Sequence, residues 1–117
     1  MKIRITVGDT AYDATLNDSA ASRDFAAQLP LKLTLSDYAG TEKVSDLPEK
    51  LSTTGAPAGT AAKAGDLTYY APWGNLAIFY KDFGHSAGLV KLGQFTDGIE
   101  RFADHSGKFE ATITAAD

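Results

Sequence analysis

The sequence predicts a mainly β domain, a closed eight-stranded antiparallel barrel that carries two short helices. Short segments in which apolar and polar residues alternate recur along the chain, whereas only two short stretches have helical spacing. The 117 residues are 44% hydrophobic and 22% charged, close to average globular usage. That length and composition predict one domain over residues 1–117 with an ordinary packed core.

The chain opens with a predicted β-hairpin. Lys2–Val7 alternates, with its three apolar side chains on one face. Gly8-Asp9 fits a two-residue hairpin turn, and the return strand runs over Thr10–Leu16. We therefore expect these two strands to pair.

A helix is expected over Ala20–Leu29, where alanines supply helix propensity and Phe25 contributes to an apolar stripe. Asp18 or Ser19 can cap its first amide groups, and Pro30 ends it.

The rest of the chain is read as six strands, one long loop and one short helix. The loop spans Pro48–Gly65, which is rich in small and polar turn formers, and Asp97 is expected to cap a helix that runs through Phe102. Closing such a chain into a barrel removes the exposed strand edges, and helices can plug the ends. The six strands are one from Leu31, a weak one over Glu42–Leu47, and runs over Asp66–Ala71, Asn75–Lys81, Leu89–Phe95 and Phe109–Ile113.

Charge and composition exclude several classes of function. The net charge of −4 and the scattered basic residues argue against a nucleic-acid partner. Cysteine is absent, which removes disulfides and thiolate chemistry. The first residues alternate charged and apolar side chains, unlike a secretory signal, and no apolar run could span a membrane. We expect a cytoplasmic protein with no membrane partner.

Several segments resemble cyclophilins. Val90–Glu100 is similar to that family's late strand and second helix, and 106–117 to its closing strand. Asp37–Lys43 and Gly65–Leu76 resemble signatures of a cyclophilin-like family of small bacterial proteins of uncharacterised function. This resemblance implies a cyclophilin-like β-barrel and little about chemistry.

The motifs of the catalytic cyclophilins are missing. Prolyl isomerases of this fold use a Phe-His-Arg strand and a Gln-Gly-Gly turn, and neither is present here. Leu89 falls near the position where the family places its cleft histidine, which His85 could approach, but the arginine that stabilises the twisted amide is absent. We expect a non-catalytic binding module. The alternative is an enzyme, either a weak or divergent peptidyl-prolyl cis-trans isomerase or another activity in the same cleft.

Aromatic density marks the candidate cleft. Half of the chain's aromatic residues lie between Tyr69 and Phe83, and rim aromatics are typical of recognition surfaces. Phe79 and either Tyr69 or Tyr70 are expected to be core residues. A peptide or a small molecule is the expected partner, and the oligomeric state is left open. The predicted cleft residues are Tyr70, Trp73, Asn75, Tyr80 and His85.

Other motifs have a structural interpretation. Gly84–Gly88 matches the Gly-x-Ser-x-Gly pattern of hydrolases, but a strand-like run follows it where that motif needs a helix, so we interpret it as a glycine-rich hairpin loop. His85 and His105 lie too far apart in sequence for a common metal motif, and the acidic residues lack calcium-loop spacing. We expect no metal and no cofactor.

Overall fold

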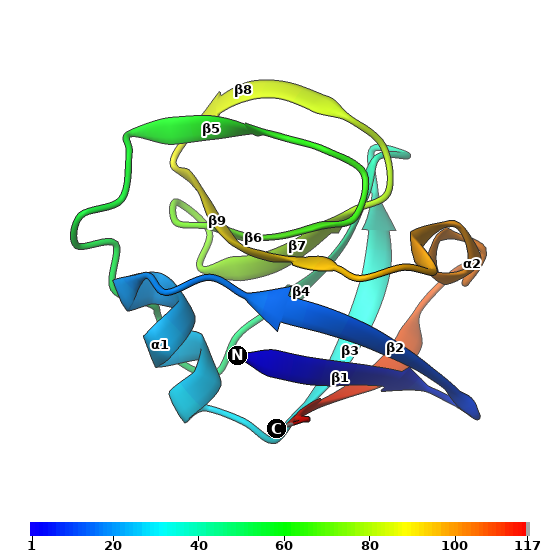
Figure 1. Cartoon of the computed structure of the whole chain (residues 1–117). Helices are drawn as coiled ribbons and strands as arrows, with labels where there is room; N and C mark the ends of the chain where they lie inside the picture. Colours follow the sequence, from blue (N-terminus) through cyan, green and yellow to red (C-terminus); the bar gives the residue numbers. More distant parts are fainter. Residues whose placement is uncertain (117) are drawn as a thin grey trace.

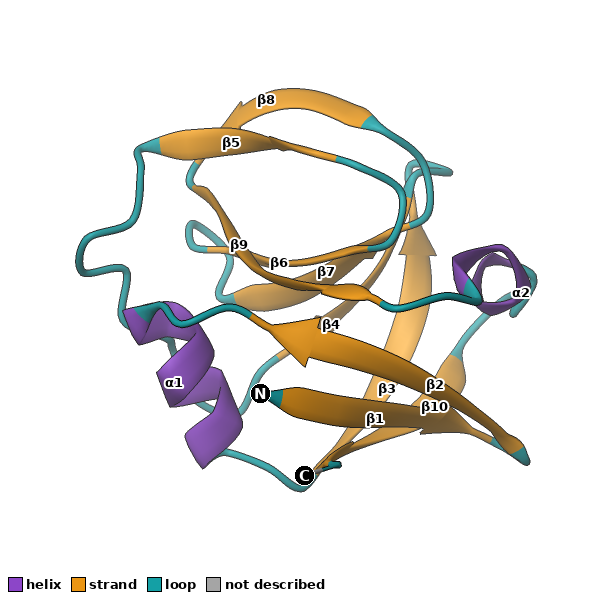
Figure 2. Cartoon of the chain, viewed as in Figure 1, coloured by secondary structure: helices purple, strands orange, loops and turns teal. Residues whose placement is uncertain are grey.

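The computed structural model describes residues 1–116, and Figures 1 and 2 show a mainly β molecule in which strands enclose a core. Eight strands close into an antiparallel barrel in the order β1-β10-β3-β4-β7-β6-β9-β2, as predicted, and β5 and β8 form a separate two-stranded ribbon. In chain order the elements are β1 (Lys2–Val7), β2 (Thr10–Leu16), α1 (Ala20–Ala27), β3 (Leu31–Tyr38), β4 (Glu42–Asp46), β5 (Gly59–Ala62), β6 (Asp66–Tyr70), β7 (Asn75–Phe79), β8 (Phe83–Ala87), β9 (Leu89–Phe95), α2 (Ile99–Ala103) and β10 (Phe109–Ala115).

The opening hairpin forms as predicted. Val7 pairs with Thr10 across the two-residue turn, and Ile3 and Ile5 are fully buried while the intervening Arg4 is exposed. This alternation places one side of each strand in the barrel interior, which is why the pattern is visible in the sequence.

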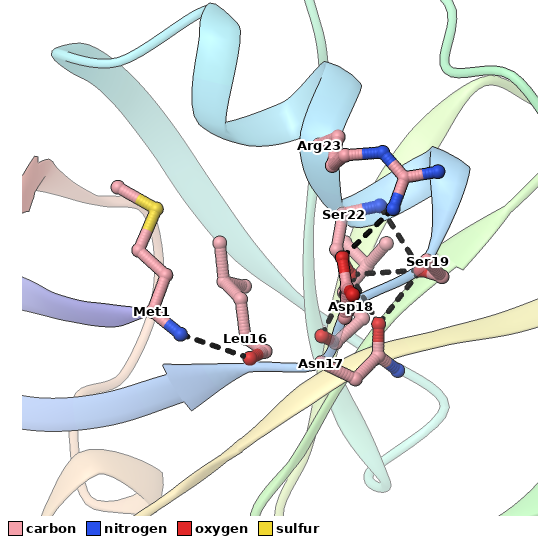
Figure 3. Close-up of polar contacts among 8 residues, drawn as sticks. Met1, Leu16, Asn17, Asp18, Ser19, Ser22 and Arg23 are labelled. Atoms are coloured by element: carbon pink, nitrogen blue, oxygen red, sulfur yellow. Dashed lines mark hydrogen bonds and ion pairs between the residues drawn. The ribbon is translucent and has the colours of Figure 1, made fainter.

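Both helices contribute a buried phenylalanine to the core, Phe25 from α1 and Phe102 from α2. Figure 1 shows the two helices on opposite sides of the barrel. The predicted cap of α1 is Ser19, whose Oγ accepts a hydrogen bond from the Ser22 amide at 3.2 Å within the polar contacts of Figure 3. No helix within residues 1–116 is long and apolar enough to cross a membrane.

Four details of the prediction are wrong. The expected loop over 48–65 contains β5, and residues 84–87 of the expected glycine-rich loop belong to β8. Asp97 does not cap α2, because the N-cap is Gly98 and makes no side-chain hydrogen bond. The first helix ends at Ala27, two residues earlier than expected. Glycine, alanine and threonine in β5 carry too little hydrophobic contrast for an alternating pattern to be recognised.

The β5–β8 ribbon covers part of the outer surface of the barrel (Figure 2). All five residues of β7 are therefore buried, with Leu76 and Ile78 in the interior core and Ala77 and Phe79 in a second, smaller apolar cluster. A strand buried on both faces indicates a second layer outside the barrel wall, and the candidate site lies between the two layers.

Candidate functional site

The outer face of the barrel wall supplies the floor of the site. Successive side chains of a strand point to opposite faces. In β4, Val44 belongs to the outer apolar cluster, while Lys43 is buried on the other side. Phe79 of β7 and Leu89 of β9 belong to the same outer cluster. These three apolar side chains form a rigid floor because they lie on paired barrel strands.

A cavity of about 210 Å³ opens above this floor. It is smaller than the roughly 300–1,000 Å³ typical of sites for drug-sized ligands. A single side chain or a small molecule matches its size. The lining comes from five barrel strands, one turn and the ribbon: Tyr38, Glu42, Val44, Tyr70, Trp73, Asn75, Phe79, Phe83, Ser86 and Leu89.

Exposed aromatic rings form the rim. Within residues 1–116, four large hydrophobic side chains are exposed, and three of them line this cavity: Trp73 at 58%, Tyr38 at 45% and Phe83 at 41%. The Trp73 ring stands nearly perpendicular to that of Tyr38, at 86° and 5.6 Å between centroids, and to that of Tyr70, at 85° and 5.3 Å. The rim therefore presents apolar contact area that the fold itself does not bury.

The turn between β6 and β7 places Trp73 at this rim. Its amide donates to the carbonyl of Tyr70 at 3.2 Å, which closes the turn. The preceding Pro72 packs against Gly88 in the turn between β8 and β9, where a Cβ would lie 2.7 Å from the proline ring. This close approach holds the two turns together, so the tryptophan projects from an anchored backbone.

Two polar side chains face the cavity with few partners. Burial raises the pKa of the Glu42 carboxyl and the charge of Asp37 acts in the same direction, while a 3.2 Å hydrogen bond from Thr41 Oγ1 opposes them. Asn75 is 5% exposed. Its Oδ1 is buried and accepts no hydrogen bond from residues 1–116. Such unsatisfied groups are unusual in native structures, and a functional role is one physical explanation.

Next to the cavity, on the opposite side of β4, lies a polar cluster that we call the Asp37 cluster: Asp37, Lys43 and Tyr80. Lys43 Nζ donates to Asp37 Oδ1 at 3.3 Å and to the carbonyl of His105 at 2.6 Å, and it lies 5.0 Å from the centroid of the Tyr80 ring. The Tyr80 hydroxyl donates to Asp37 Oδ1 at 2.5 Å. The cluster joins β3, β4 and the residue after β7, and thereby fixes the strand that carries Glu42.

This network changes the acidity of its members. The hydrogen bond from Tyr80 has the largest effect on Asp37 and, with that from Lys43, holds the pKa of this carboxyl below its ordinary value. Partial burial and the bond to the Asp37 carboxylate raise the pKa of Tyr80 to about 12. Both shifts favour the arrangement in which Asp37 is ionised and Tyr80 keeps its proton.

Three of the five predicted cleft residues line the cavity together: Tyr70, Trp73 and Asn75. Tyr80 does not, since it belongs to the Asp37 cluster, and His85 is exposed on β8 with its ring beside Gly59. The expectation for the core aromatics is confirmed, because Phe79 and Tyr69 are each 1% exposed.

The prediction omitted seven lining residues from distant parts of the chain: Tyr38, Glu42, Val44, Phe79, Phe83, Ser86 and Leu89. The sequence does contain one signal for some of them. The run Leu76–Phe79 has no polar alternation, which is typical of a strand covered on both faces. The outward residues of such a strand and of its neighbours are then candidates for a covered site.

The two histidines occupy separate places. His85 is on the ribbon, whereas the Nε2 of His105 lies 3.0 Å from the hydroxyl of Tyr12, among the aromatic rings packed around α2. Within the part of the chain that the structure describes, no group of three or more histidine and acidic side chains is placed to hold a metal ion.

Comparison with known proteins gives a family and a fold. A model of the cyclophilin-like family matches residues 5–114. A search of curated proteins finds no match. Among solved structures, the chain is similar to the solution structure of the hypothetical protein AF2241 from Archaeoglobus fulgidus, with a TM-score of 0.72 and 15% identity over 99% of this chain and 95% of that one. At this identity the likeness shows the fold alone. Since the family match spans nearly the whole sequence, this chain belongs to the cyclophilin-like family.

Proposed function

We propose that this protein is a non-catalytic binding module that receives a side chain of a peptide, or a small molecule, in the cavity beneath the β5–β8 ribbon. The observation that carries the proposal is the aromatic rim around an apolar floor, with Trp73 more than half exposed. Exposed aromatic rings beside a concave apolar site are costly to leave in water, and they are typical of recognition surfaces.

The polar groups of the cavity suit binding better than prolyl isomerisation. Isomerisation on this fold relies on a cationic side chain that stabilises the twisted amide, and preorganised charge is usually the largest catalytic effect. The ten lining residues include one carboxylic acid and no arginine, lysine or histidine. The local charge is therefore opposite to the one that the reaction needs.

The proposal is tested by backbone amide NMR of the full chain, titrated with proline-containing peptides and a metabolite library. We expect chemical-shift changes centred on Tyr38, Trp73 and Asn75, and loss of binding in Trp73→Ala. The control Arg23→Ala shortens an exposed side chain on α1 that lines a different cavity. Shift changes confined to residues outside the Trp73 cavity, or binding that is lost in the control instead, would contradict the proposal.

A protease-coupled isomerisation assay tests the absence of catalysis. We expect no acceleration at high protein concentration. An acceleration that disappears in Trp73→Ala would show an enzyme that uses this cavity.

A further inference from the structure

The Glu42 carboxylate has no cationic partner in the part of the chain that the structure describes. No lysine, arginine or histidine nitrogen of residues 1–116 lies within 4.0 Å of it. The adjacent Lys43 is directed to the other side of β4 and is held there by Asp37 and the His105 carbonyl. A partly buried carboxylate without a counter-charge is unfavourable, and a cation that enters the cavity would offset its desolvation.

The rim rings add a second attraction for a cation. Aromatic faces carry a negative quadrupole, and tryptophan attracts cations most strongly. The rings of Tyr38 and Tyr70 both stand at nearly right angles to that of Trp73. These three rings and Glu42 line the same cavity, so a positively charged group there lies among the rings and near the carboxylate.

Asn75 specifies a ligand that donates hydrogen bonds. Of the two buried side-chain atoms without a hydrogen-bond partner in residues 1–116, Gln28 Oε1 lies elsewhere, and Asn75 Oδ1 belongs to a residue of this cavity. An amide oxygen is an acceptor only. A primary ammonium group offers three N–H donors as well as a positive charge, so it suits the carboxylate directly, and a rotation of the Asn75 amide would bring the buried oxygen within its reach.

The exposed rim indicates that the ammonium group comes from a polypeptide. The cavity of about 210 Å³ matches the size of a single side chain. Trp73, Tyr38 and Phe83 extend beyond it as exposed surface. A free small amine would leave most of that surface in water, whereas a partner chain that inserts one side chain would also cover the rings around it.

We propose that the cavity binds the ammonium end of a lysine side chain presented by a partner polypeptide, an inference that rests on the binding function proposed above. The alkyl part of the lysine lies on the apolar floor and the rings. Its ammonium group reaches Glu42, next to Asn75. The partner backbone crosses the aromatic rim.

Paired probes test the charge. In NMR titrations, n-butylammonium is compared with 1-butanol, a neutral molecule of similar length, and the peptide acetyl-Gly-Lys-Gly-amide with its norleucine counterpart. We expect each cation to bind at least about fivefold more tightly than its neutral partner. Glu42→Gln should reduce that ratio to less than about twofold, and Glu100→Gln, which removes an exposed carboxylate on α2, should leave it unchanged.

The outcomes separate this inference from the proposed function. If the neutral probes bind in the cavity as tightly as the cations, the inference is overturned and the binding function stands. If no probe, peptide or library compound shifts the cavity resonances, both fail. Tighter binding of the lysine peptide than of n-butylammonium supports a polypeptide source, and equal binding overturns that part of the inference.

Discussion

Replacing Trp73 with alanine separates a binding role from a structural one. The side chain is 58% exposed, so only about two-fifths of its surface is buried. A fully buried aromatic residue costs about 3–5 kcal/mol when truncated to alanine. Scaling by the buried fraction gives an expected loss of about 1–2 kcal/mol in the free energy of unfolding. For a domain of this length that corresponds to a fall of roughly 4–8 °C in melting temperature.

The matched control is Phe79→Ala, because Phe79 lines the same cavity but is 1% exposed. Its truncation should lower the free energy of unfolding by the full amount of about 3–5 kcal/mol, which is a large part of the stability of a small domain. Urea denaturation of both variants, followed by circular dichroism, measures the difference. Trp73→Ala should then keep the fold and lose ligand binding. A loss of 3 kcal/mol or more in Trp73→Ala, on the order of a core truncation, would refute the view that this rim is a free recognition surface.

Three other perturbations test the frame of the site. Tyr80→Phe should raise the pKa of Asp37 toward its ordinary value in an NMR titration. The pKa of this carboxyl is lower in the folded than in the unfolded protein, so Asp37 stabilises the fold above its unfolded pKa and loses that effect as the pH falls through its folded pKa. Tyr80→Phe should therefore lose less stability on acidification than the unmodified protein does. With a pKa of about 12, Tyr80 stabilises the fold below pH 10 and loses that effect between pH 10 and 12. The free energy of unfolding should therefore fall over this pH range in the unmodified protein, and this fall should be absent in Tyr80→Phe. Asp37→Asn should lower the free energy of unfolding, measured in urea, by about 2 kcal/mol or more, because it leaves the 4% exposed Lys43 side chain without its anion. Lys43→Met should lower it by less, because it leaves no buried charge unpaired. Gly93→Ala should lower the free energy of unfolding in urea by at least about 2 kcal/mol, since its Cβ would lie 1.9 Å from a backbone oxygen of β2. The control Gly84→Ala has open space around the new Cβ and should leave the stability nearly unchanged.

The barrel strands could be predicted because each has one face in the core and one in solvent. In β1 and β2 that division gives a clear period of two, and the hairpin follows from the two-residue turn. The ribbon could not be predicted in this way. β8 has four exposed residues and one of intermediate exposure, so burial imposes no alternation on its sequence. Among the described residues β8 pairs only with β5, at separations of 21 to 28 positions, and local patterns do not record such contacts.

Part of the cavity lining was predictable, where its residues are neighbours in sequence. Tyr70, Trp73 and Asn75 surround one turn, and the density of aromatic residues there pointed to that segment. Glu42 comes from a strand that is distant in sequence but pairs with β7, so only the sheet register places it there. Tyr80 was assigned to the cleft because Phe79 was expected in the core, which left Tyr80 near the rim. It directly follows Phe79 of the outer cluster, and alternation directs it away from that cluster, into the Asp37 cluster.

The division between the two faces of β4 explains why the fold specifies a cavity without specifying its ligand. Lys43 is buried on the inner side of β4 and is held there by Asp37, so a change of its size or charge acts on the packing of the domain. Glu42 points outward, and within residues 1–116 its carboxylate has a single hydrogen bond, from Thr41. Trp73 likewise stands on a turn and is not part of either buried cluster. Substitutions at these two positions can therefore alter recognition while the interior stays intact, so the ligand has to be inferred from the outward side chains themselves.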